Sequence, residues 1–147
     1  AQAINATLDM QAFEPITDWY LDLEELKVLL VDDSPHARKC IRRVLEQLGL
    51  RHFIEADNGA EAAGILGDTM VDLVVTDYNM PEMDGKALVE HIRQHSWQTS
   101  VPILMVTSEQ DASRLAAIEN AGVSGICDKP FDPGTVRRLL QRALSGD

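Results

Sequence analysis

The sequence predicts a three-layer α/β domain in which helices cover both faces of a five-stranded parallel sheet. Two observations lead to this prediction. From residue 27 onward, short apolar runs alternate with longer segments that have helical periodicity. Several of the runs are almost entirely aliphatic, as expected of strands covered on both faces. Because strands and helices alternate, we expect each connection to be a right-handed crossover between parallel strands, as in doubly wound folds.

Five apolar runs are predicted to be strands, and the first, third and fourth are the most continuously aliphatic. The predicted strands are Lys27–Val31, His52–Glu55, Leu73–Thr76, Ile103–Val106 and Gly125–Asp128.

The segments between these runs are predicted to be helices. Ser34 is a suitable N-cap for the first helix, and Pro35 suits its first helical position. Glycines are expected to end three helices, at Gly49, Gly67 and Gly122. The predicted helices are Pro35–Leu48, Ala60–Leu66, Gly85–His95, Ala112–Ala121 and Pro133–Leu144.

Composition limits the function. The chain has 147 residues, 45% of them hydrophobic, which suits one domain with its own core. Its net charge of -11 argues against binding to nucleic acid or to an anionic membrane. No apolar run approaches the roughly 20 residues of a membrane span, and no signal peptide is evident, so we expect a soluble cytoplasmic protein. Cys40 and Cys127 fit no metal or disulfide spacing and are expected to be buried free thiols.

Residues 1–26 lack the alternating pattern. They contain no Lys or Arg but carry large apolar side chains, including Phe13, Trp19 and Tyr20. Such a segment is too apolar for a simply solvated leader, so we expect a linker or short helix that packs on this domain or on a neighbour. The predicted division is an N-terminal extension over 1–26 and a main domain over 27–147.

Polar side chains follow the predicted strands at their C-terminal ends. They are Asp32 and Asp33 after the first strand, Asp77 after the third, Thr107 after the fourth and Lys129 after the fifth. Carboxyl ends of parallel strands share one sheet edge, so these groups are expected to converge. Three carboxylates would repel one another unless a cation lay among them, and Mg²⁺ prefers oxygen ligands of this kind. Helix capping would explain one aspartate but not three.

The same set of groups suits phosphoryl transfer. A carboxylate near Mg²⁺, such as Asp77, can attack phosphorus and form an aspartyl phosphate. The Thr107 hydroxyl and the Lys129 ammonium could then contact the phosphoryl oxygens. Taken singly, each would be read as a turn residue or a solvated surface residue, but together at one edge they favour a phosphoryl site.

Four motifs occur in order: "LLVDDS" (29–34), "VTDYNMPEMDG" (75–85), "MVTSE" (105–109) and "DKPF" (128–131). Together they resemble the receiver domain of response regulators in two-component signalling, especially stand-alone chemotaxis regulators. The resemblance implies a flavodoxin-like strand order 2-1-3-4-5 and phosphorylation of Asp77 by a histidine kinase or histidine phosphotransfer protein. It implies that Asp32, Asp33, Asp77 and the backbone carbonyl of Asn79 bind Mg²⁺. Thr107 and Lys129 would contact the phosphoryl group.

The resemblance also identifies four modulating positions. Asn79 and Glu109 match the chemotaxis type, which implies a short-lived phosphorylated state, and the small Ser108 should leave the site open. Ile126 departs from the family, which usually has Tyr or Phe there. Because Ile is stiff and not aromatic, the usual inward turn of a ring when Thr107 moves is in question.

Phosphorylation is expected to alter the face formed by the last two helices and the strand between them. The last helix carries Arg137, Arg138 and Arg142, so an acidic output partner or a second copy of the chain would suit this face. The sequence does not identify the output partner or a fused effector domain. It fits a stand-alone regulator or part of a longer regulator or hybrid kinase.

Three other interpretations stay open. A pseudo-receiver, which binds partners without cycling, is compatible with Ile126, although the complete set of site residues argues against it. A Mg²⁺-dependent phosphohydrolase of the haloacid-dehalogenase type usually has a second aspartate where this chain has Asn79. A flavodoxin-like electron carrier needs a hydroxyl- and glycine-rich loop where this chain has "DDSPHAR". We therefore expect a signalling domain that catalyses only its own phosphorylation and dephosphorylation.

Overall fold

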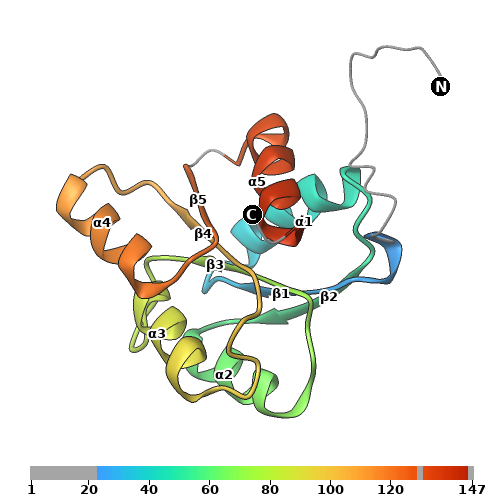
Figure 1. Ribbon diagram of the computed structural model, residues 1–147. Helices are drawn as coiled ribbons and strands as arrows, with labels where there is room; N and C mark the ends of the chain where they lie inside the picture. Colours follow the sequence, from blue (N-terminus) through green and yellow to red (C-terminus); the bar gives the residue numbers. More distant parts are fainter. Residues whose placement is uncertain (1–22, 129–130, 146–147) are drawn as a thin grey trace.

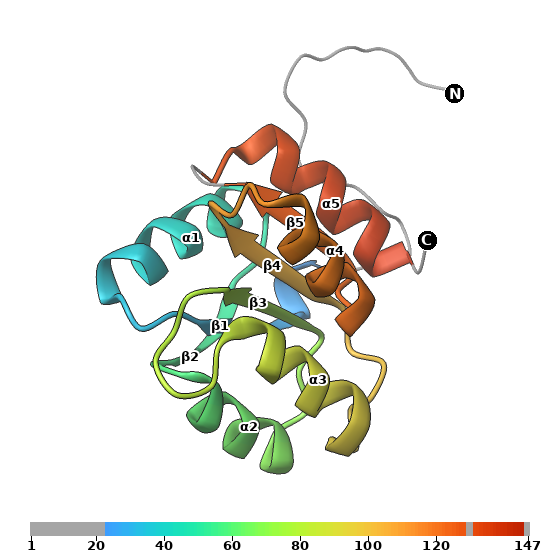
Figure 2. The same ribbon diagram turned by 90° about the vertical axis from the view of Figure 1, so that its left-hand side faces the viewer.

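In the computed structural model, which describes residues 23–128 and 131–145, helices cover both faces of a five-stranded sheet (Figures 1 and 2). All strand pairs are parallel, in the order β2-β1-β3-β4-β5. The predicted fold class and strand order are confirmed. The strands are β1 Lys27–Val31, β2 His52–Ala56, β3 Leu73–Asp77, β4 Ile103–Thr107 and β5 Gly125–Asp128. The helices are η1 Leu23–Glu25 (a 3-10 turn), α1 Pro35–Gln47, α2 Gly59–Asp68, α3 Gly85–His95, α4 Ala112–Ala121 and α5 Pro133–Ser145.

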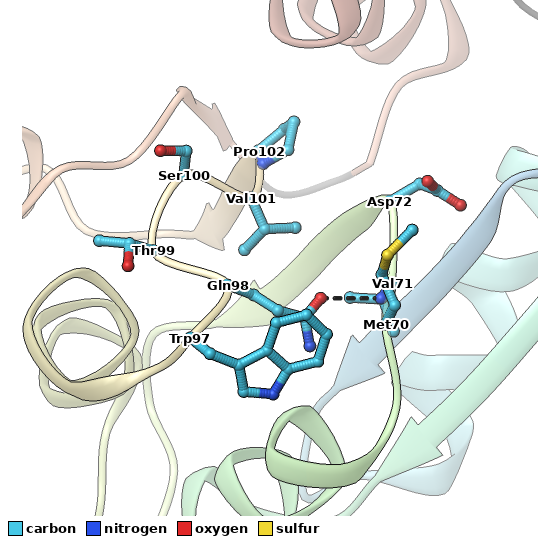
Figure 3. A pocket seen from close by; sticks show the side chains of 9 residues that line it. All are labelled: Met70, Val71, Asp72, Trp97, Gln98, Thr99, Ser100, Val101 and Pro102. Carbon is cyan, nitrogen blue, oxygen red and sulfur yellow. Dashed lines mark hydrogen bonds between the residues drawn. The ribbon is translucent and has the colours of Figure 1, made fainter.

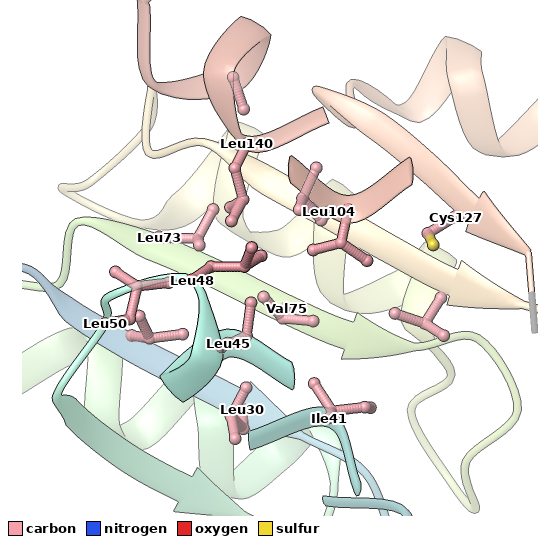
Figure 4. Packing of buried hydrophobic residues seen from close by; sticks show 14 of the residues in the cluster. Leu30, Ile41, Leu45, Leu48, Leu50, Leu73, Val75, Leu104, Cys127 and Leu140 are labelled. Atoms are coloured by element: carbon pink, nitrogen blue, oxygen red, sulfur yellow. The ribbon is translucent and has the colours of Figure 1, made fainter. Parts of the chain in front are cut away.

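Two hydrophobic clusters hold the layers together, one on each face of the sheet. Successive side chains of a strand point to opposite faces, and in β1 Leu30 joins one cluster while Leu29 joins the other. The first cluster lies under α1 and α5, with Leu45 and Leu140 among its fully buried members (Figure 4). The second lies under α2, α3 and α4. Burial on both faces explains the continuous aliphatic runs in the sequence.

Three strands, β2, β3 and β4, extend one residue further than predicted, and in β3 and β4 the added residue is polar. Asp77 is the last residue of β3 and Thr107 the last residue of β4. The ladder continues past the apolar runs because the Tyr78 N–H donates to the Val106 carbonyl at 3.2 Å. Both polar side chains therefore sit on rigid backbone.

The observed ends of the helices show which capping and glycine signals in the sequence determine where a helix starts or stops. Ser34 caps α1 by accepting a hydrogen bond from Ala37 N, and Pro35 begins the helix, as predicted. Gly122 has a φ of 112° and ends α4 in the left-handed conformation. The prediction that Gly67 ends α2 is wrong, since the helix continues through Asp68. A glycine inside a helix costs only about 1 kcal/mol relative to alanine, so its presence alone does not end one.

Both cysteines are free, but only one is buried. Cys127 belongs to the first cluster and is 1% exposed. Cys40 is exposed on α1, so the prediction that it is buried is wrong. Its position on the helix lies just outside the buried stripe that includes Ile41 and Leu45.

Residues 1–22, most of the predicted N-terminal extension, lie outside the described residues. Within the described part, Leu23 is buried in the first cluster and Leu26 packs against it. Packing on the domain therefore begins at least four residues before β1. None of the described helices is long and apolar enough to cross a membrane.

Candidate functional site

Three aspartates meet at the C-terminal edge of the sheet. One carboxylate oxygen from each of Asp32, Asp33 and Asp77 lies within 4.8 Å of the other two. They come together because β1 and β3 are adjacent parallel strands whose ends coincide. Asp32 and Asp77 are almost completely buried, whereas Asp33 is exposed. We call these three residues the acidic cluster.

The backbone around Asp32 is held in place by several hydrogen bonds. Its N–H donates to the Ala56 carbonyl at 3.1 Å, and its Oδ1 accepts from Ser34 N at 2.9 Å. Asp32 and Asp77 make other polar interactions, yet among the described residues one buried oxygen of each has no hydrogen-bond donor. Buried carboxylate oxygens without donors are costly. Together with three carboxylates at close range, this donor set fits a hard divalent cation.

The loop after β3 brings α3 very close to Asp77. Asn79, in this loop, is exposed. Glu82 has a φ of 68°, an uncommon backbone conformation for a residue other than glycine. At the start of α3, the N–H of Gly85 donates to the Tyr78 carbonyl at 2.8 Å. A Cβ at Gly85 would lie 2.4 Å from the Asp77 carbonyl oxygen, so only glycine fits here.

Thr107 ends β4, the strand adjacent to β3, and is fully buried. Its Oγ1 accepts a hydrogen bond from Glu109 N at 2.9 Å. The Glu109 carboxylate turns away toward α4, accepting from Asp111 N at 3.0 Å and pairing with Arg114 at 3.2 Å. The hydrogen bond from the Asp111 backbone N–H and the bond from the Arg114 guanidinium lower the pKa of Glu109. Ser108, between the two, is exposed.

Two of the predicted site residues, Ile126 and Lys129, belong to the segment around the end of β5. Ile126, in β5, is partly buried and packs against the second hydrophobic cluster. Lys129 lies outside the described residues. The last residue of β5, Asp128, is in register with Thr107. An open hollow of about 410 Å³ lies beside the end of β5, lined by Ser108, Glu109, Gln110, Leu115 and Asp128.

A second open hollow, of about 450 Å³, lies at the opposite end of β3 and β4 (Figure 3). Trp97 and Met70 border it and are both more than half exposed. Buried Gln98 supports it, since its side chain accepts from Val71 N at 2.9 Å and donates to the Thr69 carbonyl at 2.7 Å. This hollow contains none of the predicted site residues.

Sequence reasoning missed Arg38. Its guanidinium, near the start of α1, donates to the backbone carbonyl of Asp32 and pairs with Glu55 and Asp57. The available signal was spacing: with Ser34 as N-cap, Arg38 falls one turn into the helix, five residues after Asp33. Nothing in the charge pattern alone distinguishes it from the neighbouring basic residues of α1.

The family model of the response regulator receiver domain matches residues 28–141. The chain belongs to the receiver domain family. Chemotaxis protein CheY1 of Helicobacter pylori is 38% identical over 122 residues, covering 81% of this chain and 97% of CheY1. CheY-3 of Vibrio cholerae is 35% identical over 119 residues, covering 81% and 92%.

Solved structures agree with this assignment. The Vibrio cholerae chemotaxis protein CheY4 superposes with a TM-score of 0.73 at 34% identity, covering 81% of this chain and 98% of CheY4. The receiver domain of a histidine kinase from Syntrophus aciditrophicus gives a TM-score of 0.74 at 29% identity, covering 82% and 91%. The protein is thus a signalling domain of the response-regulator type, and the acidic cluster lies at the C-terminal edge of its sheet.

Proposed function

We propose that this receiver domain accepts a phosphoryl group on Asp77 from a phosphohistidine, carried by a histidine kinase or a histidine phosphotransfer protein. The main support is the acidic cluster, whose three carboxylates lie within 4.8 Å of one another at the sheet edge. The Thr107 hydroxyl at the end of the next strand adds a hydrogen-bond donor beside them. A carboxylate nucleophile, a cation site and a hydroxyl donor are the parts that phosphoryl transfer needs.

The acidic cluster would hold Mg²⁺ through the carboxylates of Asp32, Asp33 and Asp77 and the backbone carbonyl of Asn79. Bound there, Mg²⁺ would offset the negative charge of the phosphoryl oxygens and of the carboxylates around them. Because Asp32 and Asp77 are buried while Asp33 is exposed, the cluster opens to solvent on the side of Asp33. A phosphohistidine of a partner protein would approach from that side.

In the proposed transfer, a carboxylate oxygen of Asp77 attacks phosphorus. The new O–P bond forms as the P–N bond to the donor imidazole breaks, and the imidazole keeps the electron pair. Attack by water on the aspartyl phosphate then releases inorganic phosphate and restores the carboxylate. The rigid end of β3 supports the nucleophile, and the close approach of Gly85 keeps its backbone in place.

Thr107 would connect the phosphoryl group to the output surface. Its oxygen accepts from Glu109 N, so its O–H is available to donate to a phosphoryl oxygen. Lys129, outside the described residues, would provide a positive charge. Movement of Thr107 would pull on Glu109, whose carboxylate accepts hydrogen bonds from the N-cap of α4, Asp111, and from Arg114 in its first turn. The output partner, or a second copy of the chain, would then read the face formed by α4, β5 and α5.

Intact-mass spectrometry after incubation with acetyl phosphate tests the proposal. We expect one phosphoryl adduct that requires Mg²⁺, disappears with a chelator and is absent from Asp77→Asn. Asp68→Asn, at the exposed end of α2, is the matched control and should be labelled like the wild type. If the wild type stays unlabelled under conditions that label a known receiver domain, the pseudo-receiver interpretation is correct. Turnover of a simple phosphomonoester would favour the phosphohydrolase.

A further inference from the structure

Arg38 connects three elements beside the acidic cluster. Its side chain is only 11% exposed. The Nε atom lies 2.7 Å from Glu55 at the end of β2, and Nη1 lies 2.8 Å from Asp57 in the following loop. Nη1 also donates to the backbone carbonyl of Asp32. One guanidinium therefore joins the start of α1, the residue after β1 and the end of β2.

The bond to Asp32 also restrains the backbone of Asp33. The Asp32 carbonyl and the Asp33 N–H belong to one planar peptide unit, so a donor on that carbonyl restricts the rotation of the unit. Within the described part of the chain, the exposed Asp33 carboxylate has no hydrogen bond or ion pair of its own. Its place in the acidic cluster depends on the backbone that carries it.

We propose that Arg38 is a positioning residue of the cation site. By holding the Asp32–Asp33 peptide, it keeps the Asp33 carboxylate within reach of a bound cation. Through Glu55 and Asp57, it links this geometry to the connection between β2 and α2. The inference rests on the proposed function, because it requires the acidic cluster to bind Mg²⁺.

A purely structural role for Arg38 makes a different prediction. Burial opposes its charge, but the bonds to Glu55 and Asp57 outweigh burial and raise the pKa of the guanidinium. Its loss would therefore remove the guanidinium from Asp57, leave Glu55 paired with Arg42 alone, and lower stability whatever happens at the acidic cluster. Arg42 provides the matched control. It lies one turn further along α1 and also pairs with Glu55, at 3.1 Å, but it forms no hydrogen bond with Asp32.

The test is a Mg²⁺ titration followed by amide NMR on the full chain, in the wild type, Arg38→Met, Arg42→Met and Arg38→Lys. Methionine keeps an unbranched apolar stem and removes the donors. Loss of a residue that orients metal ligands typically weakens metal binding 10- to 100-fold, so we expect Arg38→Met to raise the Kd for Mg²⁺ about tenfold or more. We expect Arg42→Met to stay within about twofold of the wild type. Urea unfolding without Mg²⁺ measures the structural contribution of each arginine separately.

If Arg38→Met does not fold, Arg38→Lys is the variant that tests the proposal. Lysine keeps the charge but lacks the planar fork that reaches several acceptors at once, so we expect weaker Mg²⁺ binding at nearly unchanged stability. Wild-type Mg²⁺ affinity in either Arg38 variant, or equal weakening by Arg42→Met, would overturn the positioning role. Absence of Mg²⁺ binding by the wild type would instead reject the cation site itself, and the inference with it.

Discussion

Replacing Gly85 with alanine tests how closely α3 must approach Asp77. The added Cβ would lie 2.4 Å from the Asp77 carbonyl oxygen, 2.7 Å from Met105 Sδ and 2.9 Å from Tyr78 Cα. The methionine could turn aside, but the other two atoms belong to the backbone. The end of β3 and the start of α3 would therefore have to separate by about 1 Å to restore ordinary van der Waals contact.

The expected loss of stability follows from this clash. Overpacking typically costs about 1–3 kcal/mol, and contact with backbone atoms puts Gly85→Ala near the upper end. Alanine also reduces the entropy of the unfolded chain, which stabilises the folded protein by about 0.4–1 kcal/mol. The net loss is about 2 kcal/mol, or a fall in Tm of roughly 5–10 °C for a domain of this size.

Urea unfolding followed by circular dichroism measures this difference. Gly64→Ala is the control, because Gly64 lies on the exposed side of α2 and its Cβ would meet nothing within 4 Å. We expect Gly64→Ala to gain about 0.5–1 kcal/mol from helix propensity. If Gly85→Ala were as stable as the wild type or Gly64→Ala, the close approach at Asp77 would not constrain residue 85.

Two further predictions concern buried groups away from the acidic cluster. Burial raises the pKa of the Cys127 thiol to about 11, so a thiol reagent at about pH 8 should label exposed Cys40 quickly and Cys127 only after unfolding; rapid labelling of two thiols in the folded protein would contradict this. Gln98→Leu should lose about 3 kcal/mol in urea unfolding, because it leaves Val71 N and two carbonyls without partners. The exposed Gln94→Leu should change stability little, and equal effects would contradict the role of Gln98.

Much of the fold could be predicted because its determinants are local. Burial on both faces leaves aliphatic runs such as Ile103–Val106, and the cap at Ser34 is readable from three neighbouring residues. The errors arose where a longer-range contact decides. From the sequence, Thr107 is predicted to follow its strand, yet pairing with β5 keeps it inside the sheet. Cys40 was expected to be buried because cysteine is apolar, but its exposure depends on its position relative to the packed face of α1.

The acidic cluster was predictable for a different reason. Parallel strands bring their carboxyl ends to one edge, so Asp32, Asp33 and Asp77 could be expected to meet before any coordinates were known. Side chains that connect distant segments could not be found in this way. Arg38 and Gln98 are polar residues whose partners lie on other elements, and a polar residue at such a position is usually solvated. Their roles depend on the three-dimensional arrangement.

The parallel topology also determines when the site can form during folding. Because neighbouring strands are parallel, none of the described strands can pair with the next one through a short hairpin. In addition, β1 pairs with β3, with Val28 beside Leu73, only after α1, β2 and α2 have been synthesised. Such long-range pairings close large loops and slow folding. On the ribosome, a nascent chain that ends before β4 can bring Asp32 near Asp77 but has no Thr107 beside them. The complete site is therefore among the last features to appear during synthesis.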